Sequence, residues 1–253
     1  MQAAAPFYMD WTFWSFVVAG VAVVLSQLPP LRDLLGPGRA TLEVHGRIQL
    51  QHMIGYPNSA VYLSVSNVGR RSVRITAIDL LFSRGGQEIC RLDGVQYYVD
   101  PKDVKPILLV PFTLPGGGEW GHTVTFNQSL DPQEEKKLGG LRSALRMNIV
   151  RKVEERNRND PEDKALVVAD EAVLRPLLDV FEEQFTWNVG EYQVEIRVHS
   201  SNAKGATASR FRFTVYESDA AELRGYASEY KFGYGPAIDV EHHRGVWLKL
   251  TPA

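Results

Sequence analysis

Apolar and polar residues alternate along much of the chain between positions 41 and 217. In the segment 41–50 the apolar residues share one face, and they are Leu42, Val44, Ile48 and Leu50. The same period of two returns in the segments 61–65, 120–126, 192–198 and 211–215. Such alternation predicts strands with one buried side. Many short strands separated by Gly, Pro and Asn turns favour an antiparallel β-sandwich.

Two segments depart from simple alternation. In 73–82 the apolar parity slips after Ala77, which predicts a β-bulge near that residue. The segment 107–114 is apolar almost throughout, which predicts a strand covered on both faces, with an edge or a bulge at Pro111. A further edge strand is predicted near the end of the chain, at 245–250.

Helical periodicity replaces alternation between residues 131 and 186. Asp131-Pro132 forms a helix start, with an N-cap residue followed by proline at the first helical position. Apolar residues then recur at three- and four-residue steps, first at Leu138, Leu141, Leu145 and Ile149, and later at Val173, Leu174, Leu177, Leu178, Phe181 and Phe185. The first helix is basic and the second acidic, so we expect the two to pack together as a hairpin.

The order of these strands resembles an immunoglobulin-like sandwich of the fibronectin III or adhesion-domain kind. The resemblance lies in a strand ending in SNVG, a following SVRITAIDL and the late pair GEYQVEIRV and SRFRFTV. It covers 41–127 and 187–217, and a helical insertion lies between. The paired cysteines and core tryptophan of antibody-type domains are not matched, and Tyr192 stands for the tyrosine near the start of a late strand in such folds. The fold hosts many functions, so it implies none by itself.

The predicted fold class is therefore mainly β, an antiparallel immunoglobulin-like sandwich with a helical insertion, preceded by one transmembrane helix. The expected layout is an N-terminal tail (1–10), a transmembrane anchor (11–31), a linker (32–40), the first part of the sandwich (41–130), the helical insertion (131–186), the last sandwich strands (187–217) and a C-terminal extension (218–253).

The anchor is predicted from a run without charge. No Asp, Glu, Lys, Arg or His occurs from Trp11 to Leu31. At about 1.5 Å per residue, this run reaches the ~30 Å thickness of a bilayer core. No Lys or Arg precedes it, unlike a cleaved signal peptide, and aromatic residues gather at its N-terminal end. The residues expected to define the anchor are Trp11, Trp14, Val17, Ala19, Gly20 and Val24.

Flanking charge predicts the orientation of this anchor. The tail 1–10 has no Lys or Arg, whereas Arg32, Arg39 and Arg47 follow the apolar run. The positive-inside rule then places the N-terminus outside and the folded domain in the cytoplasm, at the cell (inner) membrane. Small residues of the anchor, including Ala19 and Gly20, offer a face on which helices of a homo-oligomer could pack.

Composition narrows the function classes. The 253 residues carry a formal net charge of −2, which is not the basic excess of a nucleic-acid-binding protein. Cys90 is the single cysteine and cannot form an intramolecular disulfide. The glycine-rich segment 115–121 has no P-loop lysine, and no HExxH or GxSxG motif occurs. We therefore expect no cofactor, no metal site and no catalytic residues.

The stretch 136–152 has six basic residues and no acidic one. It could contact anionic lipid or an acidic partner protein through Lys136, Lys137, Arg142, Arg146, Arg151 and Lys152. Arg70, Arg71 and Arg74 add to the same electrostatic picture. The alternative, which we favour, is that this basic helix pairs with the acidic helix that follows it.

These observations favour a single-pass, non-enzymatic binding module that acts as an adaptor or subunit of a membrane-associated protein complex. Its expected partners are the lipid bilayer and other proteins. One alternative is a membrane effector, for example of a bacterial defence system, that senses a partner and perturbs the bilayer on oligomerisation. A second alternative is an enzyme whose site is assembled from distant residues, and its candidate histidines are His122, His199, His242 and His243.

Overall fold

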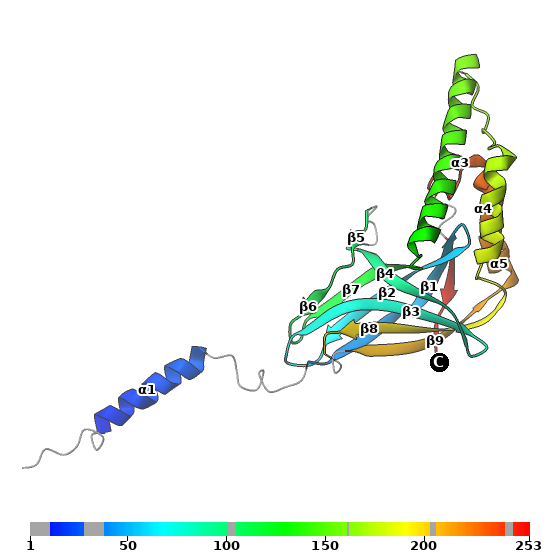
Figure 1. Cartoon of the computed structure of the whole chain (residues 1–253). Coiled ribbons are helices and arrows are strands. Elements are labelled where there is room, and N and C mark those ends of the chain that lie inside the picture. The colour runs from blue at the N-terminus through cyan, green and yellow to red at the C-terminus, as the bar shows by residue number, and fades with distance from the viewer. Residues whose placement is uncertain (1–10, 28–37, 101–104, 161, 203–205, 241–244) are drawn as a thin grey trace, which may run out of the picture.

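The computed structural model describes residues 11–27, 38–100, 105–160, 162–202, 206–240 and 245–253. The fold is mainly antiparallel β with helices, as the alternation predicted. The strands form one curved, nearly closed sheet, and helices gather at one end of it (Figure 1). Helix α1 (Trp11–Gln27) lies apart from this body.

The sheet follows one continuous path, β10-β1-β2-β7-β4-β3-β8-β9-β11, with β5 on β4 and β6 on β3. Its strands are β1 (Ala40–Met53), β2 (Tyr56–Asn67), β3 (Val73–Arg84), β4 (Gln87–Tyr98), β5 (Ile107–Leu108), β6 (Phe112–Leu114), β7 (Glu119–Asn127), β8 (Gly190–Ser200), β9 (Thr207–Val215), β10 (Val246–Lys249) and β11 (Thr251–Pro252). Every paired neighbour in this path is antiparallel.

The last segment of the described chain joins the two margins of the sheet. Leu248 of β10 pairs with Ile48 of β1, and Thr251 of β11 pairs with Arg212 of β9. Only Leu250 separates the two short strands. The predicted edge strand near the C-terminus is thus a link between β1 and β9.

The inward-facing residues of all long strands form one core. Ile48, Val61, Leu80 and Phe126 are fully buried in it. The expected slip near Ala77 is a register shift between Ile75 and Ala77 where β3 meets β8. The prediction of one buried strand over 107–114 was wrong: the segment forms β5 and β6, and Ile107 and Leu108 are 49% and 69% exposed. Pro111, which lacks an N–H to donate, lies between the two pieces.

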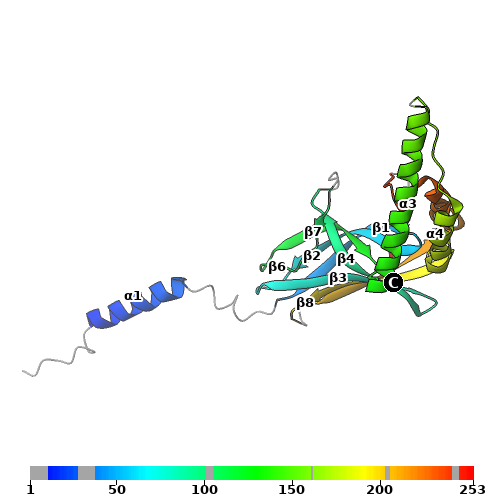
Figure 2. The same cartoon turned by 45° about the horizontal axis from the view of Figure 1, so that its top comes forward.

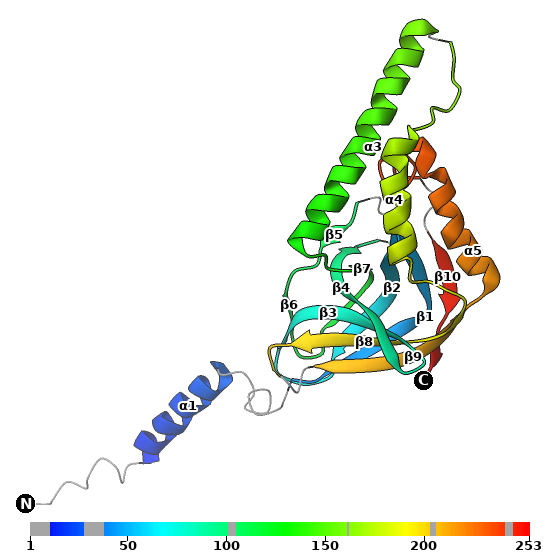
Figure 3. The same ribbon diagram turned by 45° about the vertical axis from the view of Figure 1, so that its right-hand side comes forward.

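The strands define two opposite ends of the sheet. At the entry end, the chain arrives at Gly38, β2 turns into β3 and β6 turns into β7. At the helical end, β1 turns into β2, and the chain passes from β7 into helix α3 and from β9 into helix α5. Figures 2 and 3 show the helices at this second end, away from α1.

Helix α3 (Pro132–Asn159) and helix α4 (Glu171–Gln184) lie side by side, followed later by α5 (Glu217–Gly225) and the 3₁₀-helix η3 (Tyr226–Phe232) (Figure 3). Asp131 caps α3 as predicted, since its carboxylate accepts hydrogen bonds from the N–H groups of Gln133 and Glu134, both at 2.8 Å. Pro176 lies inside α4 without ending it.

The β1–β2 turn inserts into the helical layer and couples it to the sheet. Ile54 has a left-handed φ of 53°, which is costly for a β-branched residue, yet its side chain is only 1% exposed. Its main chain hydrogen-bonds the Tyr230 hydroxyl of η3. The adjacent Trp187 is fully buried, and its Nε1 donates to the Gln51 carbonyl at 2.6 Å. Burial of Ile54 under the helices offsets the strain of the turn.

Candidate functional site

Helix α1 has an apolar surface that the folded body does not cover. Of the six predicted anchor residues, Trp11, Trp14, Ala19, Gly20 and Val24 are exposed and Val17 is half-buried. Trp11 is 84% exposed and Val24 60%. None of the α1 residues whose side chains the structure describes belongs to the core cluster.

Within the described residues, no helix has both the length and the apolarity needed to cross a membrane. Helix α1 has 17 residues, which at about 1.5 Å per residue extend about 26 Å. Residues 28–31, the remainder of the predicted span, lie outside the described residues.

Some basic residues of α3 form ion pairs or hydrogen bonds with described residues of the domain, and others form no ion pair with them. Arg151 and Lys152 form ion pairs with Asp170 at 3.2 and 2.5 Å. The Arg142 side chain donates to the Pro236 carbonyl at 2.9 Å. The remaining candidates are exposed and form no ion pair with a described carboxylate, and they are Lys136, Lys137 and Arg146. The two helices thus make part of the charge pairing that we favoured.

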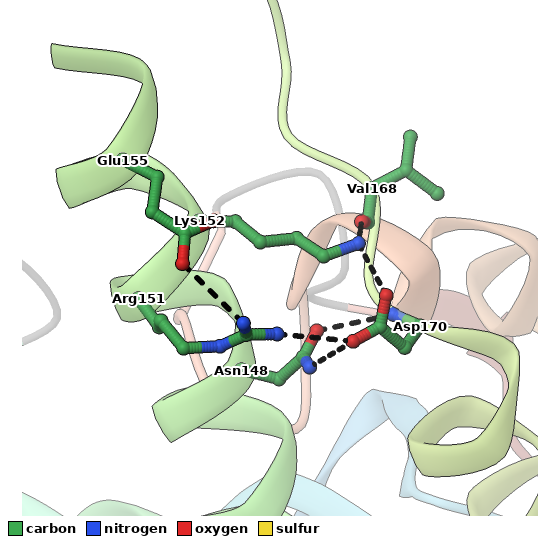
Figure 4. Close-up of polar contacts among 6 residues, drawn as sticks. All are labelled: Asn148, Arg151, Lys152, Glu155, Val168 and Asp170. Atoms are coloured by element: carbon green, nitrogen blue, oxygen red, sulfur yellow. Dashed lines mark hydrogen bonds and ion pairs between the residues drawn. The ribbon is translucent and has the colours of Figure 1, made fainter. Parts of the chain in front are cut away.

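Asp170 is the centre of the contact between α3 and the start of α4 (Figure 4). It occupies the N-cap position of α4, but its carboxylate turns away from that helix and accepts a hydrogen bond from Asn148 Nδ2 at 2.6 Å. In return, the Asp170 N–H donates to Asn148 Oδ1 at 3.0 Å. The hydrogen bond from Lys152, and then that from Asn148, hold the pKa of Asp170 below its usual value. These contacts fix the angle between the two helices.

The chain segment before Asp170 is tied to the projecting half of α3. Lys152 Nζ donates to the Val168 carbonyl at 2.8 Å, and Arg156 donates to the Ala165 carbonyl at 2.6 Å. Lys152 and Arg156 therefore hold this segment against α3 through its backbone carbonyls. Leu166 and Val168 of this segment remain 60% and 49% exposed.

A corner of backbone and aromatic side chains starts β8. The Tyr192 hydroxyl donates to the Asn188 carbonyl at 2.7 Å and also lies 3.2 Å from the Thr186 carbonyl. The Tyr192 ring stacks on Phe213, with centroids 5.4 Å apart and planes 8° from parallel. Burial raises the pKa of Tyr192 above its usual value.

An open cleft of about 590 Å³ lies beside this corner, between the β3–β4 turn and the end of α4. Arg84, Glu88, Glu183 and Tyr192 line it, together with Cys90. Burial raises the pKa of the Cys90 thiol to about 12, so the thiol stays protonated and unreactive at neutral pH. The cleft is therefore a polar recess with no activated nucleophile among its lining residues.

A second groove, of about 500 Å³, runs between α4 and η3. Its apolar lining comes from Leu174, Leu178, Phe181 and Ala227. Arg224 lies at its rim, pairs with Glu182 at 3.3 Å and covers the ring of Phe185 at 4.3 Å. Arg175 and Asp179, which also line the groove, pair with each other at 3.0 Å.

The candidate histidines do not come together. His199 contacts the buried Asp79 carboxylate on the outer face of the sheet, and Arg91 lies 3.6 Å from the same carboxylate. No described hydroxyl or thiol contacts His199. His122 packs among Tyr97 and Trp120, and its Nδ1 is the buried side-chain atom without a partner in the described part of the chain. His242 and His243 lie outside the described residues.

The described residues contain no group of three or more His, Cys, Asp and Glu side chains arranged to hold a metal ion.

Comparison with known proteins adds little. No protein-family model matches the chain, and no curated protein matches it. Among solved structures, the solution structure of a late embryogenesis abundant (LEA) protein is similar, with 10% identity and a TM-score of 0.30 over 85% of this chain and 92% of that chain. A likeness of this size carries no argument about function.

Two polar residues that organise the structure were absent from the sequence prediction. Asp170 joins the two helices, yet in the sequence it is one acidic residue among several at the second helix. Asn67 lies in the SNVG turn of the sequence, yet it is 1% exposed and forms hydrogen bonds with three segments of chain. Both act through partners that lie far away in sequence.

Proposed function

We propose that the protein is a non-enzymatic binding module that helix α1 holds at a membrane, and that it acts as an adaptor or subunit of a membrane-associated complex. The observation that carries the proposal is the uncovered apolar surface of α1. Trp11, Phe16 and Val18 are 84%, 82% and 65% exposed, and none of the described side chains of α1 packs on the core. Soluble monomers rarely expose a contiguous apolar surface of this kind.

A lipid bilayer is the partner that fits this surface. Apolar residues fill most positions of α1, and the sequence contains no charge from Trp11 to Leu31. Because a helix satisfies its own backbone hydrogen bonds, it can enter the hydrocarbon region without cost from unpaired amides. Trp11 and Trp14 supply the aromatic belt expected at a membrane–water interface.

The expected location is the inner membrane, with the domain on the cytoplasmic side. Arg32, Arg39 and Arg47 follow the apolar run, and no Lys or Arg precedes it. This asymmetry supports retention of the C-terminal side in the cytoplasm.

The immunoglobulin-like character of the sheet is also part of the proposal. The neighbours β1-β2-β7 and β3-β8-β9 follow the A-B-E and C-F-G order of such sandwiches. Tyr192 and its hydrogen bond to the Asn188 carbonyl have the geometry of a tyrosine corner at the start of strand F. Because sandwiches of this class serve many binding roles, the fold supports a binding role by analogy alone.

A charge placed in α1 tests the membrane proposal. Val21→Arg puts a cation near the middle of the apolar run, where insertion costs about 3 kcal/mol. Val21→Leu is the matched control. We expect the parent and Val21→Leu proteins to stay with the membrane fraction through alkaline carbonate washing, and Val21→Arg to be released. Release of the parent protein by carbonate would contradict a membrane-inserted α1.

A reporter fused at Ala253 tests the orientation. We expect activity from a cytoplasm-dependent reporter and none from a periplasm-dependent one. The opposite pattern would place the domain outside the cytoplasm. A membrane-potential dye separates the adaptor from the effector: depolarisation on expression would favour the effector.

A further inference from the structure

The entry end of the sheet is organised around one buried side chain, Asn67. Its Nδ2 donates to the carbonyls of Arg71 at 2.8 Å, Leu114 at 3.1 Å and Pro115 at 3.0 Å. Its Oδ1 accepts from the N–H of Gly69 at 3.0 Å. Asn67 thereby joins the β2–β3 turn to the β6–β7 turn, because a buried amide must satisfy its hydrogen bonds.

The incoming chain is bonded to the same turn. The Val68 N–H donates to the Arg39 carbonyl at 2.9 Å, and the Arg39 N–H lies 3.4 Å from Asn67 Oδ1. Further along, the Ser201 N–H donates to the Arg74 carbonyl at 3.1 Å. The turn that carries several arginines is thus held rigidly beside the point where the chain from α1 enters.

We define the entry surface as Arg39, Val68, Arg70, Arg71 and Arg74. All five side chains are exposed, and Val68 is 60% exposed. Arg39, Arg71 and Arg74 form no ion pair with a described carboxylate. At the helical end, Arg151 and Arg224 are paired with Asp170 and Glu182, whereas Lys136, Lys137 and Arg146 also form no ion pair with a described carboxylate.

The chain itself keeps this surface near α1. Ten residues, 28–37, separate Gln27 of α1 from Gly38, and at about 3.5 Å per residue they reach at most about 40 Å. Helix α3 starts at the opposite end of the sheet (Figure 1). The fold therefore places the arginines of the β2–β3 turn and the basic residues of α3 at opposite ends of the sheet. The arginines of the turn lie at the end where the chain from α1 enters.

We propose that the entry surface lies on the anionic lipid headgroups of the membrane that holds α1. Three guanidinium groups that no described carboxylate pairs with, together with an exposed apolar residue, suit a phosphate-rich interface, where each Arg strengthens attachment about fivefold. The inference rests on the proposed membrane attachment of α1. The docking proposal adds an orientation: the entry end of the sheet lies on the bilayer, and the helical end points away from the bilayer.

The test uses the full chain reconstituted in vesicles of phosphatidylcholine alone or of equal parts phosphatidylcholine and phosphatidylserine. A fluorophore at Ser201→Cys reports quenching by a headgroup-labelled lipid, and flotation reports attachment by α1. We expect flotation with both vesicles, and strong quenching only with phosphatidylserine and only at low salt.

The variant Arg39→Gln, Arg71→Gln, Arg74→Gln removes three charges from the entry surface. We expect it still to float, whereas the affinity of the entry surface for phosphatidylserine, measured by quenching, should fall about a hundredfold. Its matched control, Lys136→Gln, Lys137→Gln, Arg146→Gln, removes three charges from α3 and is expected to keep the quenching. Replacing the same three arginines by lysine should also preserve it. Equal thermal melts establish that all variants fold.

The outcomes separate the two proposals. Flotation without phosphatidylserine-dependent quenching, or equal loss of quenching in the α3 control, would overturn docking and leave the membrane anchor standing. No flotation with either vesicle would overturn the anchor and the docking together.

Discussion

The Tyr192 hydroxyl donates a hydrogen bond to the Asn188 carbonyl 2.7 Å away, across the corner that leads from the helical insertion into β8. This bond sets the position at which the chain returns to the sheet after α3 and α4. The Tyr192 ring rests on Phe213 of the neighbouring β9. The corner therefore links the insertion to the core through one side chain.

Tyr192→Phe isolates the contribution of that hydroxyl, because the ring stack on Phe213 is kept. We expect the free energy of unfolding to fall by about 1 kcal/mol, since the Asn188 carbonyl loses its donor. Urea denaturation measures it. Tyr62→Phe, at a residue that is 42% exposed, is the control and should change stability by less than about 0.5 kcal/mol. Equal effects of the two substitutions would contradict a structural role for the corner.

Gly55→Ala should be strongly destabilising. Gly55 has a φ of 87°, and an added Cβ would lie 2.7 Å from the Phe181 carbonyl oxygen of α4. Gly86 is the matched control, with a φ of 82° and no atom within 4 Å of an added Cβ. We expect about 1 kcal/mol for Gly86→Ala from backbone strain alone, and a cost more than about 1 kcal/mol larger for Gly55→Ala. Thermal unfolding compares the two, and similar losses would argue against the tight approach of α4 to the β1–β2 turn.

Asp170→Asn should loosen the contact between α3 and α4. The substitution removes the charge that faces Arg151 and Lys152 while keeping the size of the side chain. We expect faster amide hydrogen exchange in the second half of α3 and in the first turn of α4. Glu155→Gln is the control, because it breaks only the exposed pair with Arg151. Unchanged exchange in Asp170→Asn would show that the hydrogen bonds with Asn148 suffice.

Alkaline pH should destabilise the domain through its buried tyrosines. Burial, with a smaller effect of the hydrogen bond to Glu222, raises the pKa of Tyr226 to about 12. A tyrosine in the unfolded chain ionises near pH 10. The unfolded state therefore releases its proton first, so this contribution is complete below pH ~10 and is lost as the pH rises to about 12.

Tyr226→Phe tests this dependence. The variant should lose less stability than the parent between neutral pH and pH ~11, when each is unfolded with urea. It keeps part of the dependence, because burial also raises the pKa of Tyr56, Tyr192 and Tyr230. A parallel decline in both proteins would contradict the assignment to Tyr226.

The local features of the fold could be predicted from sequence because their causes are local. Alternation identified β1, β2, β8 and β9, and the Asp131-Pro132 pair located the start of α3. The shift near Ala77 was visible because a single extra residue reverses the parity of the apolar positions.

Other features depend on contacts between distant residues. The split of 107–114 into β5 and β6 follows from pairing with two different strands, which the apolar run does not specify. The role of Asn67 depends on carbonyls at 114 and 115, and that of Asp170 on α3 side chains about 20 positions earlier. For the same reason, composition grouped Arg70, Arg71 and Arg74 with the basic helix, although the fold places them at the other end of the sheet.

The link formed by β10 and β11 has a consequence for synthesis of the protein. Pairing of β10 with β1 joins residues roughly 200 positions apart, and such distant pairing is slow to form. Until the last strands are made, the margins of β1 and β9 offer unpaired backbone to any neighbouring strand. If α1 is held at a membrane as we propose, the chain would wait there with an unfinished sheet. Protection of those two margins, by a chaperone or by rapid completion of the chain, is therefore a condition for its biogenesis.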